Sequence, residues 1–196
     1  GGWALMVFYE DRSLPAVNIN LYQGFDGLSN DGNSFTLDSF YAISGTGAKA
    51  TFLSWEGDPD LTGASSGSTN PEELSITNQR NQNYVLTGDG GQTGNNSYNS
   101  TIYDNTVGPV YNNSSTYGVD LDTYDISSYI QPADSEVTAN VDVGQDFVIS
   151  ALRDCRPVPA PVAKGERQSF NIDICTSISA APLPGPLMIL FISSQS

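Results

Sequence analysis

The sequence of 196 residues contains no histidine, two cysteines and seven basic residues. Without histidine the chain lacks the commonest general base, so Ser-His-Asp and Cys-His catalysis within it are excluded. The basic residues are outnumbered by 22 acidic ones, and a net charge of −15 repels nucleic acid and anionic lipid. The longest apolar runs have six and seven residues, far short of the roughly twenty that a membrane helix needs. We therefore expect no enzyme, no nucleic-acid partner and no membrane span.

What is abundant is Ser, Thr, Asn, Gly and Tyr, while only 15% of the residues are charged. This composition is typical of extracellular β proteins. The length predicts one domain of ordinary size, or one domain with a tail. The first residue is Gly rather than Met, as expected of a chain that has lost a leader or was cut from a longer protein.

Apolar and polar residues alternate with period two over many short stretches, the mark of half-buried β-strands. Trp3 to Tyr9 is apolar throughout, which predicts a strand buried on both faces. Val137 to Val143 alternates most cleanly, and with residues 146–152 it predicts a β-hairpin. Further strands are expected at residues 17–22, 35–40, 48–55, 84–86, 95–104, 117–125 and 170–175, with turns at Asp26-Gly27 and Asp31-Gly32 and a helical turn at 126–130.

About ten strands without an amphipathic helix predict an all-β protein, an antiparallel β-sandwich or jelly roll. We place the sandwich domain at residues 1–175. Residues 176–196 form a Pro-rich connector followed by an apolar strand. That strand either closes its own sheet or fills a groove in a neighbouring copy. The residues predicted to self-associate are Leu187, Met188, Ile189, Leu190, Phe191 and Ile192.

Cys155 and Cys175 flank a Pro-rich loop, and in an oxidising compartment they are expected to form a disulfide. A catalytic thiol is the weaker interpretation, because no histidine is present to activate it.

Two acidic clusters are candidate calcium ligands, because calcium needs several oxygen atoms from neighbouring loop positions. They comprise Asp58 and Asp60, close to Glu56, and Asp120, Asp122 and Asp125. The alternative is that these carboxylates are ordinary solvated residues of an acidic protein. A carboxylate-pair glycosidase built on Glu56 would need a facing acid, and nothing in the sequence reports one.

Four Asn-x-Ser/Thr triplets are possible glycosylation sites, which would place them at the surface: Asn95, Asn99, Asn112 and Asn113. Four aromatic residues, Trp55, Tyr98, Tyr103 and Tyr111, suit either a sugar-stacking platform or the core, and we favour the core.

Five phrases occur in a recognisable order: GGWALMVFYED, SLPAVNINLYQGF, SWEGDPDLTG, YNSTI and YGVDLDTYDISSYI. They resemble a β-rich module of large secreted bacterial surface proteins, often found beside repeated β-sandwich domains. The resemblance covers most of the chain, from residue 2 to about residue 152, and brings no catalytic residues with it. The Pro-Leu-Pro-Gly-Pro phrase before the apolar tail also resembles the opening of a bacterial C-terminal sorting signal, without its long hydrophobic segment and basic end.

Composition and resemblance together predict an extracellular structural or adhesive protein of a bacterial cell surface. Its expected partners are further copies of itself, assembled into fibres or matrix, or other surface proteins. The alternative is a carbohydrate-binding module that binds glycans, with calcium as a possible cofactor.

Overall fold

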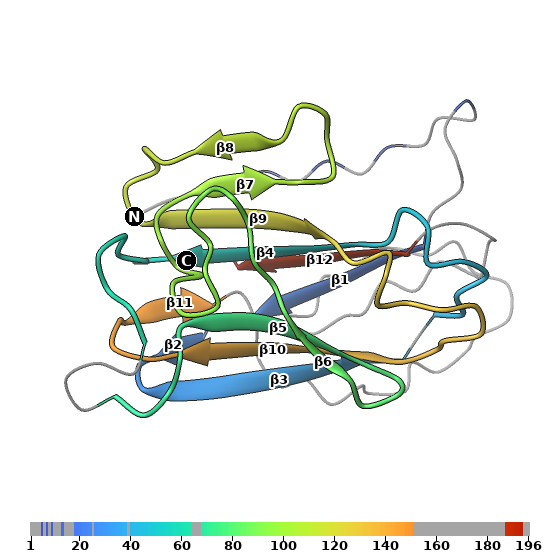
Figure 1. The fold of residues 1–196 in the computed structure, drawn as a ribbon, viewed down its shortest axis with the longest axis horizontal. Helices are drawn as coiled ribbons and strands as arrows, with labels where there is room; N and C mark the ends of the chain where they lie inside the picture. The colour runs from blue at the N-terminus through green and yellow to red at the C-terminus, as the bar shows by residue number, and fades with distance from the viewer. Residues whose placement is uncertain are drawn as a thin grey trace, which may run out of the picture.

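The computed structural model describes residues 5, 7, 9, 13, 18–24, 26–38, 40–63, 68–150 and 187–193. The described residues contain twelve β-strands and no helix, arranged in two sheets (Figure 1). The all-β prediction is confirmed, and the two sheets have the layered form of a β-sandwich.

The four-stranded sheet is wholly antiparallel. Its strands lie in the order β3 (Asp31–Leu37), β10 (Val137–Val143), β5 (Glu73–Asn78) and β6 (Asn83–Val85). Along β10 the apolar residues are buried, while the polar residues between them are half-buried on the outer face. Those outer side chains bond to their neighbours, as between Thr36 and Thr138 at 2.9 Å. The sequence alternation therefore translates directly into an inner and an outer face.

The eight-stranded sheet is mixed. Its main path runs β1 (Asn18–Gly24), β12 (Leu187–Ser193), β4 (Lys49–Trp55), β9 (Val119–Asp125), β7 (Ile102–Asp104) and β8 (Tyr111–Asn113). Strand β11 (Val148–Ser150) pairs with β4 and with β2 (Asp26–Leu28). The antiparallel prediction is wrong for this sheet, because β12 is parallel to both of its neighbours and β7 is parallel to β9. Parallel neighbours need long connections, which local alternation does not report.

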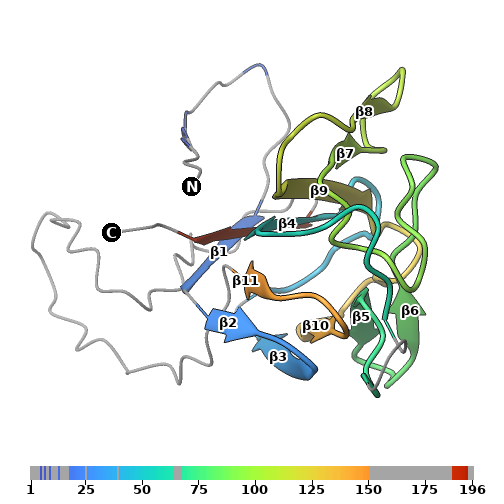
Figure 2. The ribbon, with the colours of Figure 1, turned by 90° about the vertical axis from the view of Figure 1, so that its left-hand side faces the viewer.

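The core lies between the two sheets, as the view along the strands shows (Figure 2). Phe52 of β4 meets the ring of Tyr124 of β9 edge-on at a centroid distance of 6.4 Å. Tyr103 of β7 lies 5.7 Å from the same ring. On the opposite sheet, Ile76 and Val137 are fully buried. Side chains from the inner faces of both sheets thus form a single core.

The strand buried on both faces is β4, whose residues from Ala50 to Trp55 are all buried. We predicted that role for Trp3 to Tyr9, and this is wrong at each described position. Leu5, Val7 and Tyr9 lie outside any strand, with 79%, 68% and 75% of their surfaces exposed. An unbroken apolar run predicts a strand that is buried on both faces. Only the tertiary packing determines which such run is covered on both sides.

The predicted hairpin of residues 137–152 is divided between the two sheets. Strand β10 pairs with β3 and β5, whereas β11 joins the other sheet beside β2 and β4. The Gly144 carbonyl accepts a hydrogen bond from the Asn30 N–H at 2.9 Å, which fixes the chain where it crosses. A turn sequence between two alternating runs therefore does not make them partners here.

The structure differs from three further predictions of local structure. The dipeptides Asp26-Gly27 and Asp31-Gly32 begin strands instead of forming turns, and the turn lies between them at Asn30, where φ is 49°. Of the strand expected at 95–104, only β7 forms. Residues 126–130 form a turn but no helix, started as expected by Asp125, which accepts the Ser127 N–H at 2.8 Å. Cys155, Cys175 and the strand expected at 170–175 lie outside the described residues.

Candidate functional site

An acidic pocket opens at the end of the sandwich where β4 finishes and β9 begins. It has a volume of about 510 Å³, within the usual range for ligand sites. Loops from four separate parts of the sequence form it, so only the fold brings its residues together. The acidic pocket is lined by Glu56, Gly57, Asp58, Pro59, Ser100, Ser114, Ser115, Tyr117, Gly118 and Asp146.

The backbone around the acidic pocket is strained at three residues that are not glycine. Glu56, Ser100 and Tyr117 have φ values of 69°, 57° and 54°, in the left-handed region that side chains disfavour. These are three of the six such residues in the described part of the chain. Strained backbone persists only where surrounding contacts hold it, and it concentrates at functional sites.

Ser100 holds two of the pocket loops together. Its hydroxyl donates to the carbonyl of Gly57 at 2.7 Å and accepts from the N–H of Gly118 at 2.9 Å. Gly57 has no room for a side chain, because a Cβ there would meet the Asp120 carboxylate and lie 2.7 Å from the Tyr98 carbonyl. These contacts hold the loops of the acidic pocket in fixed positions.

Asp146 forms one wall and is only 6% exposed. Its carboxylate accepts the N–H of Asp58 at 2.7 Å and the N–H of Phe147 at 2.6 Å. Its own N–H donates to Glu72, a fully buried carboxylate, at 2.8 Å. Burial raises the pKa of both Asp146 and Glu72, and repulsion from Asp58 adds to both shifts. The other Glu72 oxygen, Oε2, is buried without a hydrogen-bond partner.

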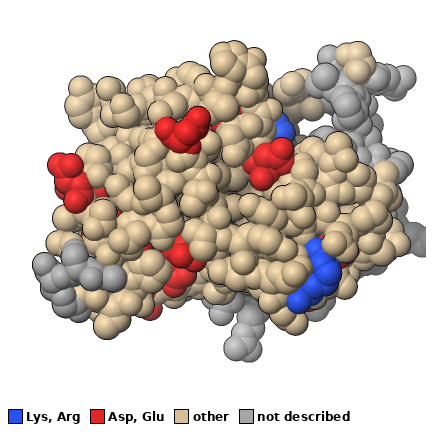
Figure 3. All heavy atoms as spheres, viewed as in Figure 1, with Lys and Arg blue, Asp and Glu red and all other residues tan. Residues whose placement is uncertain are grey.

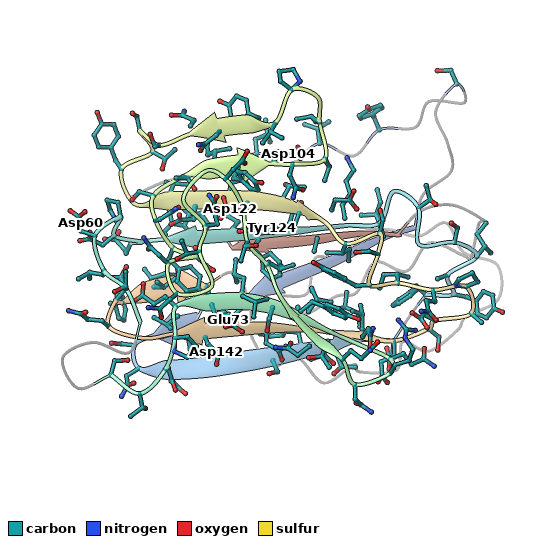
Figure 4. All side chains as sticks on the ribbon, in the orientation of Figure 1. Asp60, Glu73, Asp104, Asp122, Tyr124 and Asp142 are labelled. Atoms are coloured by element: carbon teal, nitrogen blue, oxygen red, sulfur yellow. The ribbon has the colours of Figure 1, made fainter. Side chains whose placement is uncertain are left out.

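Beneath the acidic pocket lie Asp120 and Asp122, which are 3% and 1% exposed. Burial raises the pKa of Asp120 to about 7, and burial with repulsion from Asp120 raises the pKa of Asp122 well above its ordinary value. Asp120 accepts the Thr101 N–H at 3.1 Å, and Asp122 accepts the Tyr124 hydroxyl at 3.2 Å. Figure 4 shows Asp122 and Tyr124 close to each other on β9.

No cation pairs with these buried carboxylates within the described residues. The two basic residues there are engaged elsewhere: Lys49 donates to Thr106 at 2.7 Å, and Arg80 pairs with Asp134 at 2.7 Å. On the face shown in Figure 3, acidic side chains stand apart from one another among uncharged residues. The three acidic residues that line the acidic pocket, Glu56, Asp58 and Asp146, thus have no partner among the described basic residues.

The structure separates the five aspartates predicted to bind calcium. Asp58 and Asp60 are exposed after β4, Asp120 and Asp122 are buried, and Asp125 is exposed at the far end of β9. Figure 4 shows Asp60 at the edge of the molecule, well away from Asp122. Within the described ranges, no group of three or more Asp, Glu, His or Cys side chains is arranged to hold a metal ion. The calcium prediction thus has no geometric support.

The glycosylation candidates have different surroundings. Asn99 is only 6% exposed, and its side-chain oxygen accepts the Thr101 hydroxyl at 2.6 Å, so the fold leaves no space for a glycan there. Asn95 is half-buried and donates to the Gly63 carbonyl at 2.9 Å. Asn113 is half-buried and Asn112 is exposed. The predicted surface position is therefore wrong for Asn99, and glycosylation of the other three asparagines stays a prediction.

Of the four aromatic residues considered, three are in the interior, as we favoured: Trp55, Tyr98 and Tyr103 are 2%, 1% and 3% exposed. Tyr111 is 50% exposed. The aromatic residue at the acidic pocket is instead Tyr117, which is 96% exposed. Sequence analysis missed Tyr117, Ser100 and Asp146, because no local pattern shows that three distant loops converge.

Carboxylates and serine hydroxyls in the acidic pocket can accept hydrogen bonds, and the Tyr117 ring offers an apolar face to stack on. A ligand rich in hydroxyl donors matches this arrangement, whereas an anion is repelled.

Among the described residues, no helix is long and apolar enough to cross a membrane. Comparison of the chain with protein-family models, with curated proteins and with solved structures finds no significant match.

Proposed function

We propose that this protein is an extracellular adhesive β-sandwich of a bacterial surface, and that it binds neutral glycans in the acidic pocket without chemical turnover. The observation that carries the proposal is the preformed pocket, with three strained non-glycine residues around a buried carboxylate, Asp146. Strain of about 1–3 kcal/mol per residue is retained where a site must be held ready for its ligand.

The chemistry of the wall favours a neutral polyhydroxylated ligand. Sugar hydroxyls are donors, and Glu56, Asp58 and Asp146 offer carboxylate oxygens that accept hydrogen bonds strongly. Tyr117 supplies a solvent-exposed ring on which the apolar face of a sugar can stack. Acidic polysaccharides are disfavoured, because the same carboxylates and the net charge of −15 repel them.

Location outside the cell is supported by the composition and by the resemblance to secreted surface modules. We also propose that the strands of the sandwich are connected as in a jelly roll. Self-assembly, the other role expected from the sequence, rests on a different element, strand β12.

The test is binding of the full chain to an array of neutral and acidic polysaccharides, followed by calorimetric titration with the best neutral ligand. Tyr117→Ala should weaken binding at least tenfold, about 1.4 kcal/mol, and leave the melting temperature unchanged because this side chain is almost wholly exposed. The matched control is Tyr111→Ala, half exposed on β8 outside the pocket, which should bind like the wild type.

Failure of every neutral glycan to bind contradicts the proposal, as does equal affinity of wild type and Tyr117→Ala. Turnover of a bound polysaccharide that is lost in Glu56→Gln would instead assign the acidic pocket to a hydrolase.

A further inference from the structure

Strand β12 lies inside the eight-stranded sheet, although it comes from the C-terminal end of the sequence. It pairs in parallel with β1 along its whole length, from Asn18 opposite Leu187 to Gly24 opposite Ser193. On its other side, Met188 to Leu190 pair with Lys49 to Thr51 of β4. In Figure 1 it runs between the two strands. The last described element of the chain is thus an interior strand.

Without β12 the sheet would have a gap of one strand. Strand β1 has no other partner among the described strands, so all of its pairing depends on β12. The first half of β4 would also lose its neighbour on that side, while Ser54 and Trp55 would keep theirs in β11. Two rows of unpaired backbone groups, one strand width apart, are a template for an incoming strand.

The segment between β11 and β12 is long enough to let β12 leave its own sheet. Residues 151–186 could span on the order of 100 Å if extended at about 3.1 Å per residue. The pairing partners of β12 are the same whether the gap belongs to its own chain or to another copy. The balance between the two arrangements therefore depends on protein concentration and not on new contacts.

We propose that β12 is an exchangeable strand, and that the gap between β1 and β4 is an interaction surface for β12 of a second copy of this chain. Mutual exchange produces a closed dimer, and exchange passed from copy to copy produces a fibre. This inference is independent of glycan binding, because the described lining of the acidic pocket contains no residue of β1 or β12.

The test uses cysteines that can meet only between copies. Asn20 is opposite Ile189, and neighbouring strands lie about 4.8 Å apart, within the Cα separation that a disulfide allows. One chain carries Asn20→Cys and a differently tagged chain carries Ile189→Cys, both with Cys155→Ser and Cys175→Ser. After mixing and oxidation at increasing concentration, we expect a mixed disulfide whose yield rises with concentration.

The register control pairs Asn20→Cys with Ser193→Cys, because Ser193 is opposite Gly24, about 13 Å along the strand at about 3.3 Å per residue. It should give little product. A single chain carrying both Asn20→Cys and Ile189→Cys shows whether the register exists. If this chain closes its internal disulfide and the mixture yields none at any concentration, exchange is wrong. If neither disulfide forms, the pairing itself is wrong and the proposal fails with it.

Discussion

Strands β9 and β10 have the same length and the same period, yet they turn opposite kinds of residue towards the interior. In β10 the buried positions are Val137, Ala139, Val141 and Val143. In β9 they are Asp120, Asp122 and Tyr124, while Val119 and Leu121 lie half-buried on the outer face. From the sequence alone, the valine and leucine of β9 would be expected to face the interior and its carboxylates to face the solvent.

The difference arises from what covers each strand. β10 lies between β3 and β5, whose inward residues Phe35, Leu37, Leu74 and Ile76 are apolar. β9 lies under the polar loop before β7, where the Thr101 N–H donates to Asp120 at 3.1 Å, while the Tyr124 hydroxyl donates to Asp122 at 3.2 Å. The second Asp120 oxygen, Oδ2, is buried without a hydrogen-bond partner. A buried polar group is tolerated where donors reach it and costly where none do. An inner face can thus be polar where a loop provides hydrogen bonds, and here that part of the interior lies beneath the acidic pocket.

The largest effect is expected when a carboxylate is placed in the apolar strand. Val141→Asp should destabilise the fold by about 4 kcal/mol or more, because a carboxylate would lose its hydration at this fully buried site and the two described basic residues are engaged elsewhere. Thr138→Asp, on the outer face of the same strand, should change the free energy of unfolding by only about 0.5 kcal/mol. Urea denaturation of both variants measures the difference. Similar losses in the two variants would show that the faces of β10 are not distinct.

The second prediction concerns the pH dependence produced by β9. The pKa of Asp120 is about 7 in the fold and near 3.8 in the unfolded chain. Between about pH 4 and pH 7 the unfolded chain has therefore lost a proton that native Asp120 keeps, so stability falls as the pH rises through this window. We expect a decrease on the order of 4 kcal/mol from this group, measured by urea denaturation between pH 4.5 and pH 8.

Asp120→Asn removes the titration and should flatten that part of the profile, whereas Asp60→Asn, in the exposed loop after β4, should leave it unchanged. A wild-type profile that rises from pH 5 to pH 7 would contradict this prediction.

The smallest effect is expected on the outer face of β10. Asp142 is directly opposite Glu73, and Figure 4 shows the two carboxylates on neighbouring strands. Their proximity adds to the effect of burial in raising the pKa of Glu73. Asp142→Asn should stabilise the fold by about 0.5 kcal/mol at pH 7, by removing a like-charge pair. Calorimetry in low and in high salt checks this, because a gain that persists unchanged in high salt would exclude charge repulsion as its cause.

Much of the strand content could be predicted from particular residues. Alternation placed β10 correctly and located β4 and β9 within one or two residues, because these strands carry enough apolar side chains to show the period. The strand predicted at residues 95–104 is too long, because residues 95–101 alternate only weakly. Side-chain hydrogen bonds, such as that of Asn95, hold these residues as a loop. Pairing was not predictable, as β11 shows by joining the sheet opposite β10.

The candidate site was only partly visible. Asp58 and Asp120 were singled out as acidic residues, and they do lie at the acidic pocket and beneath it. Their suggested companions Asp60 and Asp125 lie elsewhere. Ser100 and Asp146 carry no local signal, because the first acts through a strained backbone and the second through loops distant in sequence.

By itself, the sequence determined the period of the strands, the absence of histidine chemistry and the excess of negative charge, because these depend on residue identity and local spacing. The tertiary structure decided which face of β9 is buried, which loops form the acidic pocket, and where the apolar C-terminal strand inserts. Each of these depends on contacts between residues far apart in the chain. A one-dimensional pattern states what each segment needs for burial, and the packing of all segments together determines which of them obtains it.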